Sequence, residues 1–116
     1  MVVGNAADRS SQLLKGVLDM CLLAVISEEP SYGYEMVRKL ADRGLDLVSE
    51  GTIYPVLSRL QKSGYLQGYL VESSGGPARK YYRLTEEGAT ALAKWEGGWR
   101  QLAAAVENVL RGADGA

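Results

Sequence analysis

The sequence predicts a mainly α-helical fold with a small β-wing: a winged helix-turn-helix followed by a long C-terminal helix. Three observations predict it. Residues 51–62 form an amphipathic helical segment, residues 65–84 are typical of a hairpin around a Gly-rich turn, and apolar residues recur at spacings of three and four from 92 to 109. At 116 residues, the chain has room for one core but not for a separate catalytic lobe.

The first predicted helix begins at a serine cap, Ser10 or Ser11, and runs to about Ile26. Its apolar residues lie almost all round it, so it must be covered on two sides, by the core and by either a partner chain or a ligand. These residues are Leu13, Leu14, Val17, Leu18, Cys21, Leu22, Val25 and Ile26.

Two shorter helices follow. The first runs from Tyr32 to Arg43, with Ser31 as its expected N-cap and Gly44 suited to the left-handed C-cap position. The second has apolar residues at i, i+3, i+4 and i+7 and ends at Gly64, and we expect its cap at Ser49 or Thr52; the apolar set is Ile53, Val56, Leu57 and Leu60.

Pro55 decides between these two starts. A proline beyond the first helical turn costs ~3 kcal/mol, whereas in the first turn its missing N–H has no partner to lose. We therefore favour a start at Thr52, or a loosely wound first turn. The wing comes next, with strands near 65–71 and 80–84 and a flexible turn at 73–77.

The last predicted helix begins after Thr85, with Glu86 and Glu87 favouring its positive end. Its apolar residues form a coiled-coil seam, which favours dimerisation over simple packing. Gly97 and Gly98 cost about 1 kcal/mol each relative to alanine and predict a bend or a very close helix contact. The seam, which is the predicted dimer interface, comprises Leu92, Trp95, Trp99, Leu102, Val106 and Val109.

The expected organisation is a flexible N-terminal end, a winged helix-turn-helix domain, a dimerisation helix and a flexible tail, at residues 1–10, 11–84, 85–112 and 113–116.

Charge is distributed unevenly along the chain. The net charge is −1, yet residues 51–84 carry five Lys and Arg against one acidic residue. A basic middle between acidic ends is what an electrostatic footprint for phosphates needs.

The helix at 51–62 offers a polar face that suits duplex DNA. Thr52, Pro55, Arg59 and Lys62 lie on this face, flanked by Tyr54 and Ser58. Arginine can make paired bonds to guanine, so Arg59 is our candidate base reader, and we expect Lys62 to contact the backbone. Two cations on one helix are more often plain solvated charges. The wing pair Arg79 and Lys80, placed for the minor groove, shifts the balance to DNA binding.

Other classes of function find little support. The chain has no histidine, and its single cysteine, Cys21, lies in an apolar run and reads best as a buried small hydrophobe. The close carboxylate pairs, Asp42 with Asp46 and Glu86 with Glu87, fit loop solvation and helix-end electrostatics. We expect no enzyme activity, no metal and no cofactor. The longest apolar run is too short for a bilayer, and no signal peptide pattern is present, so we expect a cytoplasmic protein without membrane contact.

At this point the sequence resembles the PadR family of bacterial transcriptional regulators, in its short subfamily with a single C-terminal helix. The resemblance covers about residues 13 to 110 and rests on three segments: Tyr32-Gly33-Tyr34-Glu35, Gly51-Thr52-Ile53-Tyr54-Pro55-Val56-Leu57-Ser58-Arg59-Leu60 and Gly76-Pro77-Ala78-Arg79-Lys80-Tyr81-Tyr82-Arg83-Leu84-Thr85.

The resemblance implies a homodimer that represses by binding a palindromic operator. It implies DNA contacts from Tyr34 and the wing, and an aromatic effector stacked on a tryptophan of the last helix. The expected DNA-binding residues are Tyr34, Ser49, Gly51, Thr52, Tyr54, Pro55, Ser58, Arg59, Lys62, Arg79 and Lys80. The candidate effector residues are Leu14, Leu18, Trp95 and Trp99, although plain interface packing is slightly favoured over ligand stacking for the two tryptophans.

Two alternatives stay open. The winged helix could dock a protein instead of DNA, and such an apolar interface would depend little on salt, unlike a phosphate-driven complex. Activation instead of repression also fits, because that depends on where the operator lies relative to a promoter.

Overall fold

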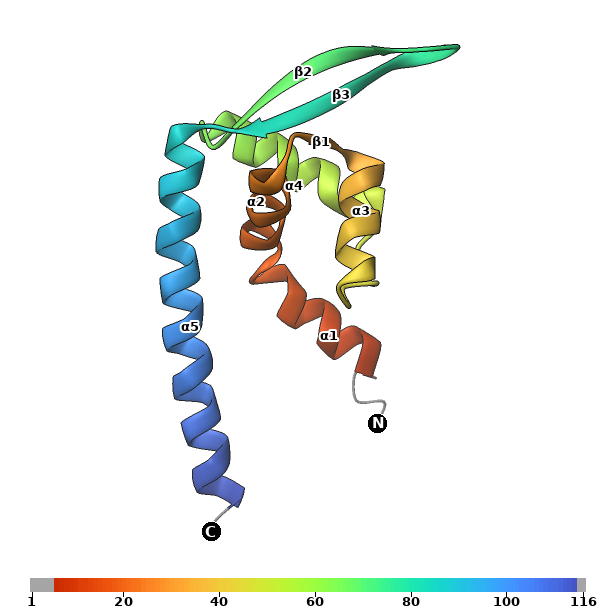
Figure 1. Ribbon diagram of the computed structural model, residues 1–116. Coiled ribbons are helices and arrows are strands. Elements are labelled where there is room, and N and C mark those ends of the chain that lie inside the picture. Colours follow the sequence, from red (N-terminus) through yellow and green to blue (C-terminus); the bar gives the residue numbers. More distant parts are fainter. Residues whose placement is uncertain (1–5, 115–116) are drawn as a thin grey trace.

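The computed structural model describes residues 6–114 as a small helical domain beneath a twisted sheet, with one long helix leaving it (Figure 1). The sheet has the order β1-β3-β2 and is antiparallel. In chain order, the elements are α1 (Ala6–Lys15), α2 (Leu18–Glu28), β1 (Ser31–Tyr32), α3 (Gly33–Asp42), α4 (Glu50–Lys62), β2 (Leu66–Ser73), β3 (Gly76–Leu84) and α5 (Glu86–Asp114).

The prediction of a single N-terminal helix ending near Ile26 is wrong. The helix is interrupted at Gly16 and Val17, and the axes of the helical segments on either side differ by 63°. Glycine weakens the helix there, and the bend lets α2 bury its apolar residues while Leu13 of α1 stays 66% exposed. No single helix in the described part is long and apolar enough to cross a membrane; only the bent pair of α1 and α2 together would meet that test.

The ends of the chain differ from the expected bounds. α1 begins at Ala6, so the part of the predicted flexible end from residue 6 to 10 is helical, and residues 1–5 lie outside those described. α5 continues to Asp114, two residues beyond the predicted bound, and residues 115–116 are also outside the described part.

Ser31 belongs to a strand that the sequence did not predict. Ser31 and Tyr32 pair with Tyr82 and Tyr81 of β3. Ser31 is fully buried and donates its hydroxyl to the Glu29 carbonyl at 3.1 Å, so it is not the N-cap of α3. Tyr32 is the N-cap, and its backbone N–H donates to Glu35 Oε1 at 3.3 Å. A strand of two residues is too short to leave a period in the sequence.

α4 begins at Glu50 after Ser49, so the later start at Thr52 is wrong. The backbone N–H groups of Thr52 and Ile53 both donate to the Ser49 carbonyl, at 3.1 and 3.2 Å. Pro55 therefore lies beyond the first turn, where its ring removes one helical hydrogen bond. Burial of the apolar face offsets that loss, because Ile53 and Leu57 are fully buried.

The wing is longer and its turn tighter than predicted. β2 and β3 pair from Leu66 and Leu84 out to Ser73 and Gly76, with Gly75 at φ 77° in the turn. Only glycine adopts this backbone conformation at no steric cost.

α5 begins as predicted, because the backbone N–H of Gly88 donates to the Thr85 hydroxyl oxygen at 3.0 Å. The same hydroxyl donates to the Gly64 carbonyl at 2.6 Å, which joins α5 to the end of α4. The helix runs without a break through Gly97 and Gly98, and a Cβ at either would meet nothing within 4 Å. The predicted bend is therefore absent, and no other helix of the described chain packs closely against these two glycines.

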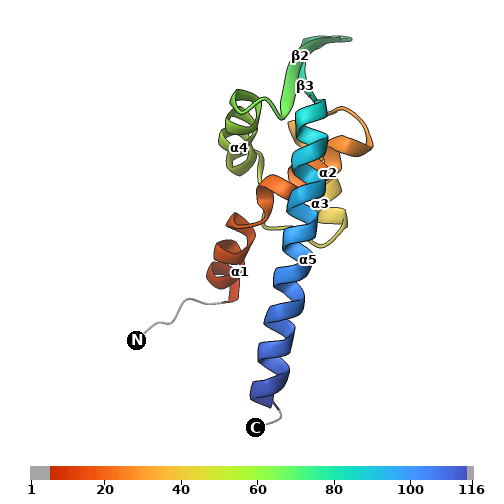
Figure 2. The ribbon, with the colours of Figure 1, turned by 90° about the vertical axis from the view of Figure 1, so that its left-hand side faces the viewer.

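The core lies where α2, α3, α4 and the base of the sheet meet. Its buried members include Leu22, Leu23, Met36, Ile53, Leu57 and Tyr82. Only the first part of α5 joins it, through Ala91 and Leu92, and the C-terminal part projects past the rest of the domain in both views (Figure 2).

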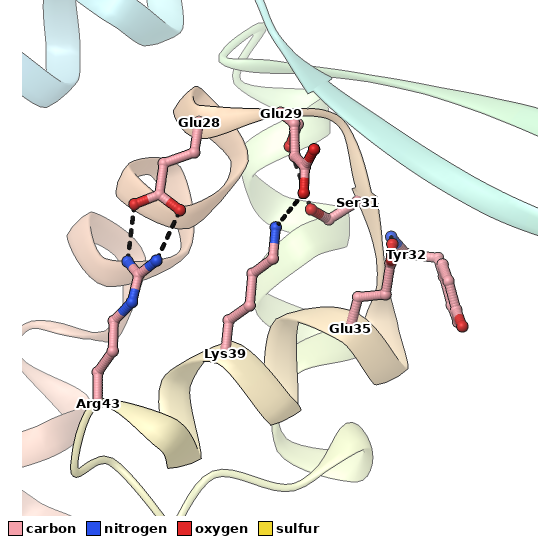
Figure 3. Close-up of polar contacts among 7 residues, drawn as sticks. All are labelled: Glu28, Glu29, Ser31, Tyr32, Glu35, Lys39 and Arg43. Atoms are coloured by element: carbon pink, nitrogen blue, oxygen red, sulfur yellow. Dashed lines mark hydrogen bonds and ion pairs between the residues drawn. The ribbon is translucent and has the colours of Figure 1, made fainter.

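Ion pairs across the surface fix α3 against the end of α2 (Figure 3). Arg43 forms a two-pronged bond with Glu28 at 2.7 and 2.8 Å, and Lys39 donates to Glu29 at 2.8 Å. The bond from Arg43 lowers the pKa of the Glu28 carboxyl. Because both side chains of the Glu28 pair are exposed, the pair orients the helices more than it stabilises the fold.

Candidate nucleic-acid interface

The exposed face of α4 lies between the start of α3 and the wing. Its core side holds Ile53, Leu57 and Leu60, whereas all the predicted contact residues of this segment are exposed. These are Ser49, Gly51, Thr52, Tyr54, Pro55, Ser58, Arg59 and Lys62. The hydroxyl oxygens of Ser49 and Thr52 lie 2.9 Å apart, so the two side chains form one hydroxyl pair at the start of the helix.

Two contacts hold the distal end of the Tyr54 side chain. Its ring packs against the backbone of Gly33, where a Cβ would lie 2.6 Å from the tyrosine oxygen. Its hydroxyl donates to Glu50 Oε1 at 2.7 Å, and this bond raises the pKa of Tyr54. A side chain at position 33 would therefore require the end of the Tyr54 ring to move. Glu50, which the sequence analysis did not include in the site, is thus the acidic neighbour of the half-exposed Tyr54.

Arg59 points away from the wing. One of its guanidinium nitrogens donates to both carboxylate oxygens of Asp19 on α2, each at 2.8 Å. The pair is partly exposed and joins α4 to the start of α2. The charge of our candidate base reader is thus already paired in this structure.

The wing cations lie on opposite faces of β3 because successive strand residues alternate. Arg79 stacks over the ring of Tyr32, 4.7 Å from its centre. Lys80 lies 5.3 Å from the ring centre of Tyr82 and passes close over Gly68 beside Gln61 of α4. Both are exposed and lie within the strand, several residues from the turn, instead of at the wing tip.

A row of tyrosines crosses from α3 to the wing. Tyr34 stacks on Tyr32, Tyr32 meets Tyr81 across the β1–β3 pair, and Tyr81 stacks on Tyr69, with ring centres 6.5, 5.2 and 6.1 Å apart. Arg38 lies 6.0 Å from the Tyr34 ring. The row fixes the wing against the helix-turn-helix. Only the spacing of Tyr32 and Tyr34 hinted at it in the sequence, because the missed strand β1 supplies its centre.

A pocket of about 690 Å³ opens between α1, α2 and α5. Of the four candidate effector residues, Trp95 and Trp99 line this pocket, whereas Leu18 is buried in the core and Leu14 packs against the core. Trp95 also meets Tyr65 edge-on at 5.4 Å, so its ring is partly committed to packing. The full lining is Leu13, Lys15, Gly16, Val17, Asp19, Met20, Arg59, Lys94, Trp95, Gly98, Trp99 and Leu102.

The predicted seam of α5 divides in two. Leu92 is buried within the chain and Trp95 is half-buried, but the four residues that follow along the seam are exposed. Their exposed fractions are 46% for Trp99, 59% for Leu102, 47% for Val106 and 70% for Val109. Within the described residues, no group of His, Cys, Asp and Glu could hold a metal ion.

This architecture can be compared with known proteins. Residues 22–94 match the model of the transcriptional regulator PadR-like family. The chain belongs to this family. As a PadR-like protein it is a DNA-binding transcriptional regulator and not an enzyme.

Solved PadR-like structures are similar over most of this chain. A PadR-like transcriptional regulator from Bacillus cereus is 46% identical with a TM-score of 0.76, over 85% of this chain and 96% of that one. A PadR family regulator from Eggerthella lenta is 36% identical with a TM-score of 0.79, over 88% of each chain. The transcriptional regulator YqjI of Escherichia coli is 34% identical over 66% of this chain. The matched region spans only 36% of the length of YqjI.

In this PadR-like chain, the structure brings together the start of α3, the exposed face of α4 and the base of the wing. Tyr34, Tyr54 and Lys80 come from these three elements. Arg59 joins the pocket instead, beside Trp95 and Trp99. The residues that sequence reasoning missed are Glu50, Arg38 and the remaining tyrosines of the row.

Proposed function

We propose that the protein is a homodimeric repressor that binds a palindromic operator in the cytoplasm. One α4 helix enters each major-groove half-site, and each wing follows the adjacent minor groove. The observation that carries this proposal is the exposed apolar seam of α5, which a single chain leaves in water, while α4 of the same chain presents an exposed polar face. Two-fold pairing along the seam would give the dimer two reading helices, and operator half-sites one helical turn apart, roughly 34–36 Å, are the geometric requirement.

Selection of bound duplexes from a randomised library tests the proposal directly. A two-fold palindrome supports a dimeric reader and gives the half-site spacing. Absence of any enriched sequence, with no binding at low salt, would instead favour a winged helix that docks another protein. Reporter expression with the selected operator placed over a promoter then separates repression from activation.

We expect the wing cations to carry phosphate contacts. Lys80→Ala or Arg79→Ala should make the slope of log affinity against log salt shallower by about one per protomer. Each variant loses one phosphate contact, so fewer counterions are released when the protein binds DNA. Arg59→Ala should leave the slope nearly unchanged, because Asp19 already pairs that charge. Salt titrations of operator binding by fluorescence anisotropy measure all three.

Two results would contradict this division of roles. Unchanged slopes for both wing variants would remove the wing from the interface. A loss of affinity on Arg59→Ala that is confined to one operator base pair would restore Arg59 as a base reader, which then leaves Asp19 on binding.

We further propose that a planar aromatic molecule binds in the pocket beside Trp95 and Trp99 and releases the operator. The pocket supports this because apolar rings and the paired Arg59 of α4 share its lining. A bound molecule that displaces Arg59 from Asp19 would shift α4, and with it the spacing of the two reading helices.

Quenching of tryptophan fluorescence by a panel of planar aromatic compounds tests this effector site. A compound that quenches should also weaken operator binding, and Trp99→Leu should abolish both effects while keeping the seam apolar. If no compound quenches, the tryptophans serve plain interface packing. Trp99→Leu should then weaken dimerisation, because leucine fills less of the interface than tryptophan.

A further inference from the structure

We propose that Glu50 reads a base with an exocyclic amino group, cytosine before adenine, and that Tyr54 is the positioning residue that aims its carboxylate. This inference rests on the proposed entry of α4 into the major groove. It adds an acidic specificity determinant to a surface otherwise described by its cations and hydroxyls.

The first step is location. Glu50 is the first residue of α4 and is exposed, at the end of the helix nearest to the hydroxyl pair of Ser49 and Thr52. Tyr54 lies one turn further along the same face, with 46% of its surface exposed. Residues in the first turns of a reading helix are those that reach base edges in the major groove.

The second step is rigidity. The Tyr54 hydroxyl donates to Glu50 Oε1 at 2.7 Å, while the tyrosine ring lies against the backbone of Gly33, with no space for even a Cβ there. An exposed glutamate normally samples many rotamers. Here one carboxylate oxygen accepts a bond from a tyrosine whose distal end rests against Gly33, so less rotamer entropy is lost when the carboxylate contacts a base.

The third step is chemistry. Among the described residues, Glu50 takes part in no ion pair, so no cationic side chain neutralises its carboxylate on a surface that the proposed function places against phosphates. A carboxylate accepts hydrogen bonds only, and the major-groove edge of cytosine offers a donor without a competing acceptor. Adenine offers a donor beside an acceptor nitrogen, and guanine and thymine offer acceptors that repel the carboxylate. Glu50 therefore penalises wrong bases more than it strengthens binding to the right one.

A simpler role exists for an acidic residue in this place, because a carboxylate in the first turn stabilises a helix through the positive charge at its end. That role needs neither the Tyr54 bond nor the tight contact at Gly33. It also predicts no change in sequence preference, so the two roles give different results.

The experiment is selection from a randomised duplex library by the full-length protein and three variants. Glu50→Gln keeps the shape and removes the charge, Tyr54→Phe keeps the ring against Gly33 and removes the bond, and Glu107→Gln removes the same charge from the exposed surface of α5 as a matched control. Thermal melts of each variant show that the fold is retained.

We expect the selected site of the unaltered protein to hold cytosine at one symmetric position in each half-site. Glu50→Gln should shift that position toward adenine, which pairs with a glutamine amide, and change the preference by about tenfold. Tyr54→Phe should weaken the cytosine preference at the same position without shifting it. Glu107→Gln should select the original site.

Two outcomes overturn the inference, and they are distinct. If the unaltered protein and Glu50→Gln select the same palindrome, Glu50 acts only on the helix end or on phosphates. This conclusion holds whether or not the variant binds that palindrome more tightly. If the unaltered protein selects no sequence, the proposed function fails and the role of Glu50 falls with it.

Discussion

Val106→Asp should convert the protein to a monomer and abolish tight operator binding. Val106 is 47% exposed in the single chain and lies on the α5 seam between Leu102 and Val109. In the proposed dimer the substitution places two unpaired carboxylates in an apolar interface, one from each protomer. The desolvation of these charges should raise the dimer dissociation constant by at least on the order of a hundredfold.

Sedimentation equilibrium measures the association, and operator titrations measure its consequence. Ala104→Asp is the matched control, because it adds the same charge to an exposed position on the opposite side of α5, given 100° per residue. The control should remain dimeric. A dimer that survives Val106→Asp would show that α5 does not pair along this seam, and two-fold operator reading would then need another interface.

Gly88→Ala should destabilise the fold more than any other alanine replacement of an α5 glycine. Gly88 is buried in the first turn of the helix, where a Cβ would collide with the carbonyl oxygen of Tyr65 and lie 2.7 Å from Leu84 Cδ1. A backbone carbonyl cannot turn aside as a side chain can. We expect a loss of about 3 kcal/mol in the free energy of unfolding, at the upper end for overpacked sites.

Gly97→Ala provides the comparison. No atom lies within 4 Å of a Cβ at this position, which is on the side of α5 opposite the seam, so alanine should stabilise the helix by up to about 1 kcal/mol. Urea unfolding of both variants at equal protein concentration measures the difference. Equal stabilities would mean that α5 is not anchored to the base of the wing at Gly88. A strong loss for Gly97→Ala would reveal a close partner on that side.

Local sequence patterns predicted the parts of the fold that depend on neighbours along the chain. The i, i+3, i+4, i+7 spacing from Ile53 to Leu60 identified α4 and its buried face, and Thr85 gave the start of α5. The same patterns misplaced the N-terminal helix and the start of α4. At Pro55, burial of apolar residues overrode a local preference. At Gly16, the local weakness of glycine and the burial of α2 act together, and the apolar pattern that continues through this position hid the bend.

The candidate site shows the same division. The exposed face of α4 and the wing cations could be read from helical and strand periodicity. The pairing of Arg59 with Asp19 joins residues 40 positions apart, and no local period reports such a contact. The tyrosine row depends on β1, whose two residues are recognisable as a strand only beside β3.

By itself, the sequence determined the class of fold, the order of the helices from α3 onward and of the wing, the seam of α5 and the resemblance to PadR-like regulators. These follow from periodicity, capping and motif, all of which act over a few residues. Only the tertiary structure decided which charges remain free. It paired Arg59 with Asp19, set Lys80 beside α4, and fixed Glu50 through Tyr54 and Gly33. The physical reason is that hydrogen bonds and close contacts depend on distances in space, which the chain acquires only when its elements pack.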